Sequence, residues 1–194
     1  MTEPRTILGI DPGTNLLGFG VVRVDAAGAP HYVDMGVLDL RKQQDPYEKL
    51  ACIHAKVAGL CDLHRPDVLA VESPFYGKNA QVILKLGRAQ GAAMTAALSR
   101  GIPVFEYAPR KAKMAICGNG AASKEQVSLI VQRTLGIDIE PRYLDATDAL
   151  AIAMCHFYQS GSMLSSAPKG RSRSRSGGAS SWEQFVKDNP DRVK

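Results

Sequence analysis

Four acidic residues stand where the sequence favours metal-assisted chemistry. Asp11 and Glu72 each close a short apolar run, and Asp145 and Asp148 lie three positions apart. That spacing places Asp145 and Asp148 on one face of a helix. Carboxylates gathered at one sheet edge repel one another, and hard cations such as Mg²⁺ or Mn²⁺ offset this repulsion. Two such ions about 4 Å apart can activate a water molecule and stabilise the leaving oxygen of a phosphodiester.

Each of these acids also has an ordinary structural explanation. Asp145 suits a helix N-cap, and Asp148 suits the first turn of a helix, where the helix dipole favours negative charge. Asp11 precedes Pro-Gly and suits a turn. Glu72 is harder to explain in this way, because a carboxylate that ends an apolar strand needs a partner. Spacing alone does not show that the four side chains converge.

The elements that must position these acids follow from hydrophobic patterns and turn residues. Short apolar runs between turns predict strands, and apolar residues three or four positions apart predict helices. An antiparallel start followed by alternating strands and helices favours an α/β domain with a mixed sheet. The strands are predicted at 7–10, 18–24, 33–40, 68–72 and 103–107, and the helices at 46–64, 79–99, 123–135 and 145–158.

The composition changes after residue 160, so residues 1–160 are predicted to form the folded domain. Residues 161–181 are rich in Ser, Gly and Arg, which predicts a disordered linker. Residues 182–194 form a short segment with apolar residues at helical spacing. The chain beyond 160 has seven Lys and Arg against three Asp and Glu, so it carries +4 of the net charge of +5. This tail could add salt-sensitive DNA affinity, although a solvated linker is the favoured interpretation.

The composition also argues against several classes of protein. Hydrophobic residues make up 45% of the chain and charged residues 22%, as in a protein with its own core. No apolar run approaches the roughly 18 residues that span a membrane, and the N-terminus lacks the features of a secretory signal. We therefore expect a cytoplasmic protein without a membrane partner. The four cysteines and four histidines show no metal-ligand spacing, so any metal would bind oxygen.

Four longer motifs resemble the RuvC family of Holliday junction resolvases. They are ILGIDPGTNLLGFGVV, LAVESPFYGKNAQVILKLGRAQG, PVFEYAPRKAKMAICGNGAASKEQV and LDATDALAIAMCH, in this order, and they span about residues 5–158. The resemblance implies an RNase H-like fold, with a mixed five-stranded sheet flanked by helices. It also implies one active site formed by Asp11, Glu72, Asp145 and Asp148. This site would bind Mg²⁺, as two ions per site, with Mn²⁺ as a substitute.

The resemblance further implies what the enzyme acts on. A homodimer would place two active sites on a four-way DNA junction, and each site would nick one of two opposed strands in recombination and repair. The nicks would be ligatable, with 5′-phosphate and 3′-hydroxyl ends. The branch-migration proteins RuvA and RuvB are the expected partners. Gly87, Gly91 and the pair Ala92-Ala93 suit a close dimer contact, although packing against the sheet explains them equally well.

Contacts with DNA are implied for one aromatic and several basic residues. The family has an aromatic that stacks on a base near the exchange point, and an exposed ring suits this role. It also has basic residues near the active site, which here flank the glycine-rich segment 118–120. A core phenylalanine and a solvated charged loop are the alternatives. The candidates are Phe75, Lys78, Arg110, Lys111, Lys113 and Lys124, and Lys85 and Arg88 extend the basic stripe of the long helix.

Three other functions are compatible with parts of the pattern. The segment GIDPGT also resembles the phosphate-binding turn of actin- and hexokinase-type phosphotransferases, but those enzymes need two large lobes and this chain has 194 residues. A YqgF-like RNA-processing nuclease would share the fold and the GxDxG start. A catalytically inactive junction-binding scaffold would tolerate loss of a carboxylate, yet all four matching positions are acidic.

Overall fold

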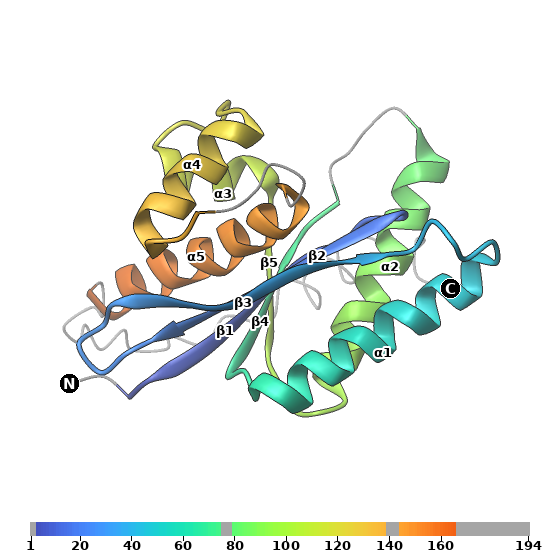
Figure 1. Ribbon diagram of the computed structural model, residues 1–194, viewed down its shortest axis with the longest axis horizontal. Coiled ribbons are helices and arrows are strands. Elements are labelled where there is room, and N and C mark those ends of the chain that lie inside the picture. The colour runs from blue at the N-terminus through green and yellow to red at the C-terminus, as the bar shows by residue number, and fades with distance from the viewer. Residues whose placement is uncertain (1–2, 75–78, 139–143, 166–194) are drawn as a thin grey trace, which may run out of the picture.

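The structure is a computed structural model that describes residues 3–74, 79–138 and 144–165, with side chains up to residue 160. It contains a five-stranded sheet with helices on both faces (Figure 1). The strands are β1 (Arg5–Asp11), β2 (Leu16–Val24), β3 (Pro30–Asp39), β4 (Val68–Glu72) and β5 (Val104–Tyr107). The helices are α1 (Pro46–His64), α2 (Ala80–Leu98), α3 (Pro109–Cys117), α4 (Lys124–Leu135) and α5 (Leu144–Ser165).

The sheet joins an antiparallel meander to a parallel pair, in the order β3-β2-β1-β4-β5. β1 pairs antiparallel with β2 and parallel with β4, and β4 pairs parallel with β5. The mixed five-stranded sheet expected for an α/β domain is therefore confirmed. Because β1 and β4 are neighbours and parallel, their carboxyl ends lie at the same edge of the sheet.

Side chains alternate between two hydrophobic clusters, one on each face of the sheet. Ile7 of β1 packs in a cluster with Leu150 of α5, whereas Leu8 and Ile10 pack in a second cluster with Ile53 of α1. This alternation follows from the two-residue repeat of a strand. Helices α1 and α2 therefore cover one face, and α3, α4 and α5 cover the other (Figure 1).

Strands β1 and β2 each have a glycine where α5 crosses them. Gly9 and Gly20 are paired across β1 and β2. A Cβ at Gly9 would lie 2.1 Å from the carbonyl oxygen of Ala149, and a Cβ at Gly20 would lie 2.7 Å from Cγ of Leu150. The backbone of α5 thus approaches the sheet more closely than any larger residue at Gly9 would permit.

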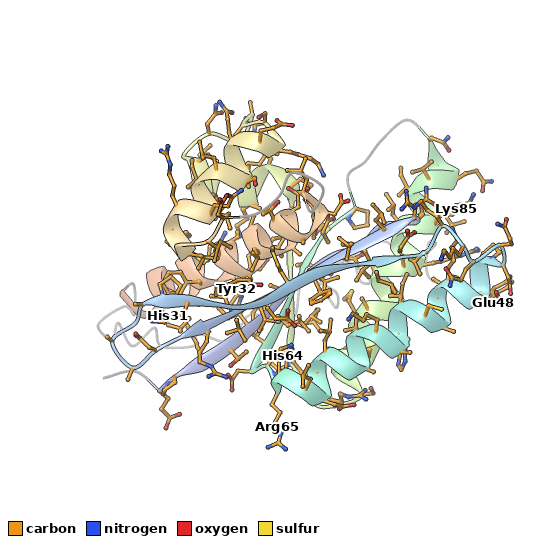
Figure 2. All side chains as sticks on the ribbon, viewed as in Figure 1. His31, Tyr32, Glu48, His64, Arg65 and Lys85 are labelled. Atoms are coloured by element: carbon orange, nitrogen blue, oxygen red, sulfur yellow. The ribbon has the colours of Figure 1, made fainter. Side chains whose placement is uncertain are left out.

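A short contact also fixes the far end of α1. His64, the last residue of α1, pairs with Asp34 of β3 at 3.0 Å. The helix stops at Arg65, which has a φ of 46° and donates its backbone N–H to the carbonyl of Cys61 (Figure 2). This left-handed cap turns the chain towards β4.

The structure differs from the sequence-based prediction at two places. Helix α3 was not predicted, because its basic residues were interpreted as a DNA-binding patch, with a solvated charged loop as the alternative. Its helical conformation starts at Pro109 and buries Ala112 against the α5 layer. Helix α5 runs to Ser165 rather than ending at Tyr158, so it enters the segment predicted as a linker. The rest of that linker and residues 182–194 lie outside the described residues.

No helix in the described part of the chain combines the length and the apolar character that crossing a bilayer demands.

A buried histidine connects α5 to β5. The Tyr107 hydroxyl lies 2.8 Å from Nδ1 of His156, and the ring of Phe105 lies 4.9 Å from the imidazole, between centroids. Burial lowers the pKa of His156 to about 4 and raises the pKa of Tyr107 to about 12. At neutral pH both side chains are therefore uncharged, and the Tyr107 hydroxyl and Nδ1 of His156 share one hydrogen bond.

This histidine predicts an acid-sensitive contribution to stability. The folded pKa of about 4 is below the unfolded value of 6.5, so between these values the unfolded chain binds the proton more tightly. The free energy of unfolding should therefore fall by about 2 kcal/mol, from this residue alone, as the pH drops from 7 to about 4.5. Urea titrations of wild type and His156→Gln at both pH values measure it, because the variant lacks the titrating group. Equal pH dependence in both proteins would contradict the prediction.

Candidate metal-binding active site

The parallel register of β1 and β4 brings Asp11 and Glu72 together. Ile10 is aligned with Val71, so the next residue on each strand is an acid at the same sheet edge. The two carboxyl groups share a side-chain hydrogen bond. The strand alternation turns both side chains towards the face that α5 covers.

The start of α5 brings in the other two acids. Gly18 of β2 is aligned with Asp11, and a Cβ at Gly18 would lie 2.0 Å from the carbonyl oxygen of Asp145. This close approach brings the first turns of α5 to the end of β1. One carboxylate oxygen from each of Asp11, Asp145 and Asp148 then lies within 4.8 Å of the other two. Glu72 is outside this group of three but contacts it through Asp11.

The four predicted acids therefore lie at one edge of the sheet. The roles of helix N-cap and turn residue account poorly for Asp145 and Asp11. Asp145 is inside the first turn of α5 rather than at its N-cap position, since the helix begins at Leu144. Asp11 is the last residue of β1 rather than a turn residue. The donor set is entirely carboxylate oxygen, which is the ligand chemistry that hard divalent cations prefer. The cluster is compatible with metal binding.

Burial raises the pKa of three of these carboxyl groups, those of Asp11, Glu72 and Asp148. Burial, followed by the charge of Asp11, raises the pKa of Glu72 to about 9. Burial also raises the pKa of Asp11, although the hydrogen bond with Glu72 opposes the change. The pKa of Asp148 is raised by burial against the opposing effect of Lys124. A divalent cation would favour the charged forms of all these groups, because it offsets both desolvation and mutual repulsion.

Lys124 is the cation that the fold places against this cluster. It is the first residue of α4, and its ammonium contacts Asp148 directly and lies 3.7 Å from Oδ1 of Asp145. Burial works against its charge, but the hydrogen bond to Asp148 and the neighbouring acids outweigh burial and raise the pKa of Lys124. The start of α4 is itself fixed by a capping box between Ser123 and Gln126.

Lys113 supports the same region from α3. Its ammonium donates to the carbonyl of Ala122 at 2.7 Å, immediately before the N-cap of α4. It thereby holds the segment that carries Lys124. The lysine predicted as a DNA contact thus has a structural contact as well.

Replacing Lys124 should raise the affinity of the site for a divalent cation, whereas a substitution that damages the site would lower it. The ammonium competes with a divalent cation for the oxygens of Asp148 and Asp145, so Lys124→Met should tighten Mn²⁺ binding by about two- to fivefold. Calorimetric titration of the DNA-free protein with Mn²⁺ measures this directly. Lys111→Met, which removes a cation lying over the Tyr107 ring, is the matched control. Unchanged or weaker Mn²⁺ binding in the Lys124 variant would rule out the competition.

The other predicted DNA contacts are distributed over two regions. Arg110 and Lys111 lie on α3, and a Cβ at Gly120 would lie 2.6 Å from Cγ of Arg110, so this arginine packs over the glycine-rich segment. Lys85 and Arg88 lie on α2, in the opposite helix layer. Phe75 and Lys78 lie outside the described residues.

Gln90 is a residue near the site that sequence reasoning missed. It is buried on α2, and its amide donates to Oε2 of Glu106 at 2.7 Å and to the carbonyl of Glu72 at 3.4 Å. It therefore connects the ends of β4 and β5 from the α2 side of the sheet, opposite the face to which the Glu72 carboxylate points. The signal available in the sequence was a polar residue on the face of α2 that packs against the sheet, where the other buried residues are small and apolar.

Comparison with known proteins decides the family. Residues 7–156 match the family model described as "Crossover junction endodeoxyribonuclease RuvC". The chain belongs to the RuvC family. As a member it is a crossover junction endodeoxyribonuclease, a hydrolase that acts on DNA, so the predicted family and enzyme class are confirmed.

Individual RuvC proteins match almost the whole chain. The crossover junction endodeoxyribonuclease RuvC of Bacteroides fragilis is 51% identical, over 99% of this chain and 97% of that protein. The corresponding protein of Christiangramia forsetii is 48% identical, over 100% of this chain and 95% of its own length. Two such relatives agree with the family match.

A solved structure supports the fold. Thermus thermophilus RuvC in complex with a Holliday junction substrate superposes with a TM-score of 0.74 and 37% identity, and the match covers 80% of this chain and 94% of that one. The RNase H-like fold expected from the sequence motifs is thereby confirmed.

Proposed function

We propose that this chain resolves four-way DNA junctions by hydrolysis at a divalent-metal site formed by Asp11, Glu72, Asp145 and Asp148. The observation that carries the proposal is the group of three carboxylate oxygens within 4.8 Å, with Glu72 hydrogen-bonded to Asp11. The Thermus thermophilus relative was solved with a Holliday junction substrate, which supports the same substrate class here.

In this proposal, one group of residues binds metal and another group binds DNA. The four acids would hold Mg²⁺, as two ions, with Mn²⁺ as a substitute. Bound divalent ions activate a water molecule and stabilise the leaving oxygen of a phosphodiester. Once metal occupies the carboxylates, the ammonium of Lys124 is free to pair with a DNA phosphate. The remaining proposed DNA contacts are Phe75, Lys78, Arg110, Lys111 and Lys113.

Two copies of the chain are needed to place two such sites on one junction. On α2, Leu84 is 51% exposed, and a Cβ at Gly87 or Gly91, three and seven positions further along the same helix face, would meet no atom within 4 Å. This exposed face of small and apolar side chains suits a homodimer contact. The dimer would nick two opposed strands symmetrically and leave 5′-phosphate and 3′-hydroxyl ends.

The cellular setting follows from the same proposal. RuvA and RuvB are the branch-migration partners that the family implies. The four cysteines form no disulfide, and burial raises the pKa of the Cys61 and Cys155 thiols, the latter to about 11. Free thiols agree with a reducing cytoplasm.

A nicking assay tests the proposal. The full chain is incubated with Mg²⁺ and a synthetic four-way junction, a DNA duplex of the same arm sequence, or an RNA hairpin. Paired symmetric nicks in the junction alone are expected. Retarded mobility without nicks would favour an inactive scaffold, and cleavage of the hairpin would favour a YqgF-like RNA nuclease.

Shortening the chain after Ser165 should leave the active site working. Both hydrophobic clusters and all four acids lie before this point. Nicking by the shortened chain at low salt is expected to stay within about twofold of nicking by the full chain. Any DNA affinity that the basic tail adds to the full chain should be lost as the salt concentration rises. Single-turnover assays at two salt concentrations measure both effects. A truncated chain that folds but does not nick at low salt would show that the tail is required.

A further inference from the structure

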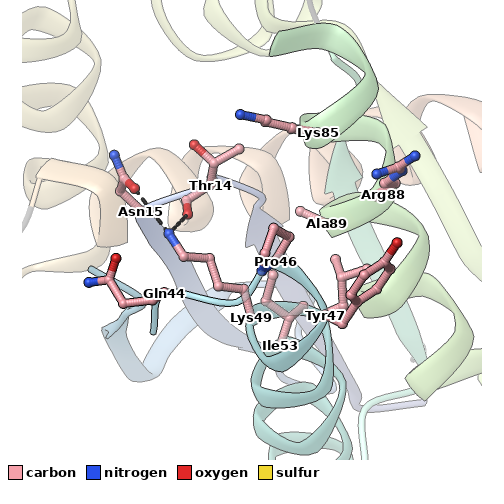
Figure 3. A pocket seen from close by; sticks show the side chains of 11 residues that line it. Thr14, Asn15, Gln44, Pro46, Tyr47, Lys49, Ile53, Lys85, Arg88 and Ala89 are labelled. Atoms are coloured by element: carbon pink, nitrogen blue, oxygen red, sulfur yellow. Dashed lines mark hydrogen bonds between the residues drawn. The ribbon is translucent and has the colours of Figure 1, made fainter. Parts of the chain in front are cut away.

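A cavity of about 260 Å³ lies at the same end of the sheet as the carboxylates, in the opposite helix layer. Its walls come from the loop after β1, the first turns of α1 and the first half of α2 (Figure 3). Thr14 lines it and follows Asp11 by three residues, which span at most about 10 Å. A DNA strand that reaches the carboxylates is therefore within a few nucleotides of this cavity.

The cavity carries positive charge that its walls do not neutralise. Lys49, Lys85 and Arg88 line it, and its lining includes no acidic residue. Lys49 donates to the carbonyl of Thr14 at 3.0 Å and to Oδ1 of Asn15 at 3.4 Å, so it shapes the cavity (Figure 3).

Lys85 and Arg88 are the cations available to a ligand. Both are exposed, and within the described ranges neither forms an ion pair. Glu48 stands on the first turn of α1 at this end of the molecule but does not line the cavity (Figure 2). Because Lys85 and Arg88 are three positions apart on α2, they lie on one helix face and can hold a single anion.

The rest of the lining is apolar and includes an exposed ring. Tyr47 is 73% exposed at the mouth, and Leu50, Ile53 and Ala89 form the wall behind it. Cations beside an exposed aromatic ring are the combination that binds single-stranded nucleic acid, because the cations hold the phosphate and the base stacks on the ring. A volume of about 260 Å³ is too small for a duplex and is of the order of one nucleotide.

We propose that this cavity binds one nucleotide of an unpaired junction strand, with its phosphate on Lys85 and Arg88 and its base against Tyr47. The inference rests on the proposed junction-resolving function and adds a second contact point for the strand, on the other side of the sheet edge from the carboxylates. A four-way junction offers such a nucleotide where strands exchange and stacking is interrupted.

Junction binding by a double variant tests the proposal. Lys85→Ala/Arg88→Ala in the full chain is expected to weaken junction binding about tenfold, and to lower the slope of log K against log salt by about 0.7, the contribution of one single-strand phosphate. Arg23→Ala/Arg133→Ala removes two exposed cations elsewhere and should change neither quantity. Tyr47→Ala should weaken binding several-fold, and Tyr47→Phe should restore it because the ring remains.

The measurements are made with EDTA, so they do not depend on nicking. If the Lys85/Arg88 variant matched the control variant in affinity and salt slope, the cavity would not contact DNA and the inference would be wrong. If inorganic phosphate raised the melting temperature as much as thymidine monophosphate while junction binding was unaffected, the cavity would be a small-anion site instead. Failure of wild type to nick the junction would overturn the proposed function and leave this binding result standing.

Discussion

Replacing Asp11 with Asn is expected to reduce junction nicking in Mg²⁺ by about a thousandfold or more, because metal-assisted hydrolysis loses a central ligand. Asp11 is the residue that connects the others, since it belongs to the group with Asp145 and Asp148 and also hydrogen-bonds Glu72. Its neutral replacement keeps the size of the side chain but removes the charge that attracts the cation. Junction binding should stay within about threefold, because phosphate contacts come from basic residues.

Two measurements distinguish a loss of metal binding from a loss of DNA binding. Single-turnover nicking is compared between wild type and Asp11→Asn in Mg²⁺, and junction affinity is measured for both proteins in EDTA. Asp62→Asn is the control, because it removes one carboxylate from an exposed pair with Arg100. An Asp11 variant that cut at the wild-type rate would show that the carboxylate cluster is not the active site.

The second large effect is expected on folding. Gly18→Ala would place a Cβ 2.0 Å from the carbonyl oxygen of Asp145, a backbone atom that no side-chain rotation can move away. The start of α5 must then shift from β2, so the free energy of unfolding should fall by about 3 kcal/mol or more. Because this shift also carries Asp145 away from Asp11, Mn²⁺ affinity should fall with stability.

A matched glycine substitution provides the control. Gly59 lies in the middle of α1, and a Cβ there would meet no atom within 4 Å. Gly59→Ala is expected to raise the free energy of unfolding by about 0.5–1 kcal/mol, because alanine favours the helix. Urea denaturation of both variants measures the contrast. Similar stabilities for Gly18→Ala and Gly59→Ala would show that α5 has room to move.

Much of the fold depends on patterns among residues that are close together in the chain, and these patterns can be read from the sequence. The alternating and helical apolar patterns predicted the five strands and four of the five helices, because strand and helix periodicities depend on neighbours in the chain. α3 escaped prediction because it buries Ala112 alone among its residues and carries three basic side chains in its first five positions. In so short a helix, tertiary contacts rather than local pattern stabilise the helical state.

The active site is different, because its residues meet across the tertiary structure. The motifs of the sequence identified Asp11, Glu72, Asp145 and Asp148 through their resemblance to the RuvC family, but their spacing in the chain does not determine a distance. Only the parallel register of β1 with β4, and the approach of α5 to Gly18, bring these carboxylates to one sheet edge.

The cationic neighbours of the site also depend on tertiary packing. Lys124 and Asp148 are 24 positions apart, and they meet because α4 packs beside α5. Lys49, Lys85 and Arg88 share a cavity because α1 and α2 lie in the same layer. The sequence by itself therefore determined the elements and the residue types available for chemistry, and the tertiary structure decided which charges face one another. The physical reason is that periodicity acts over a few residues, whereas electrostatic interactions depend on distances that only packing sets.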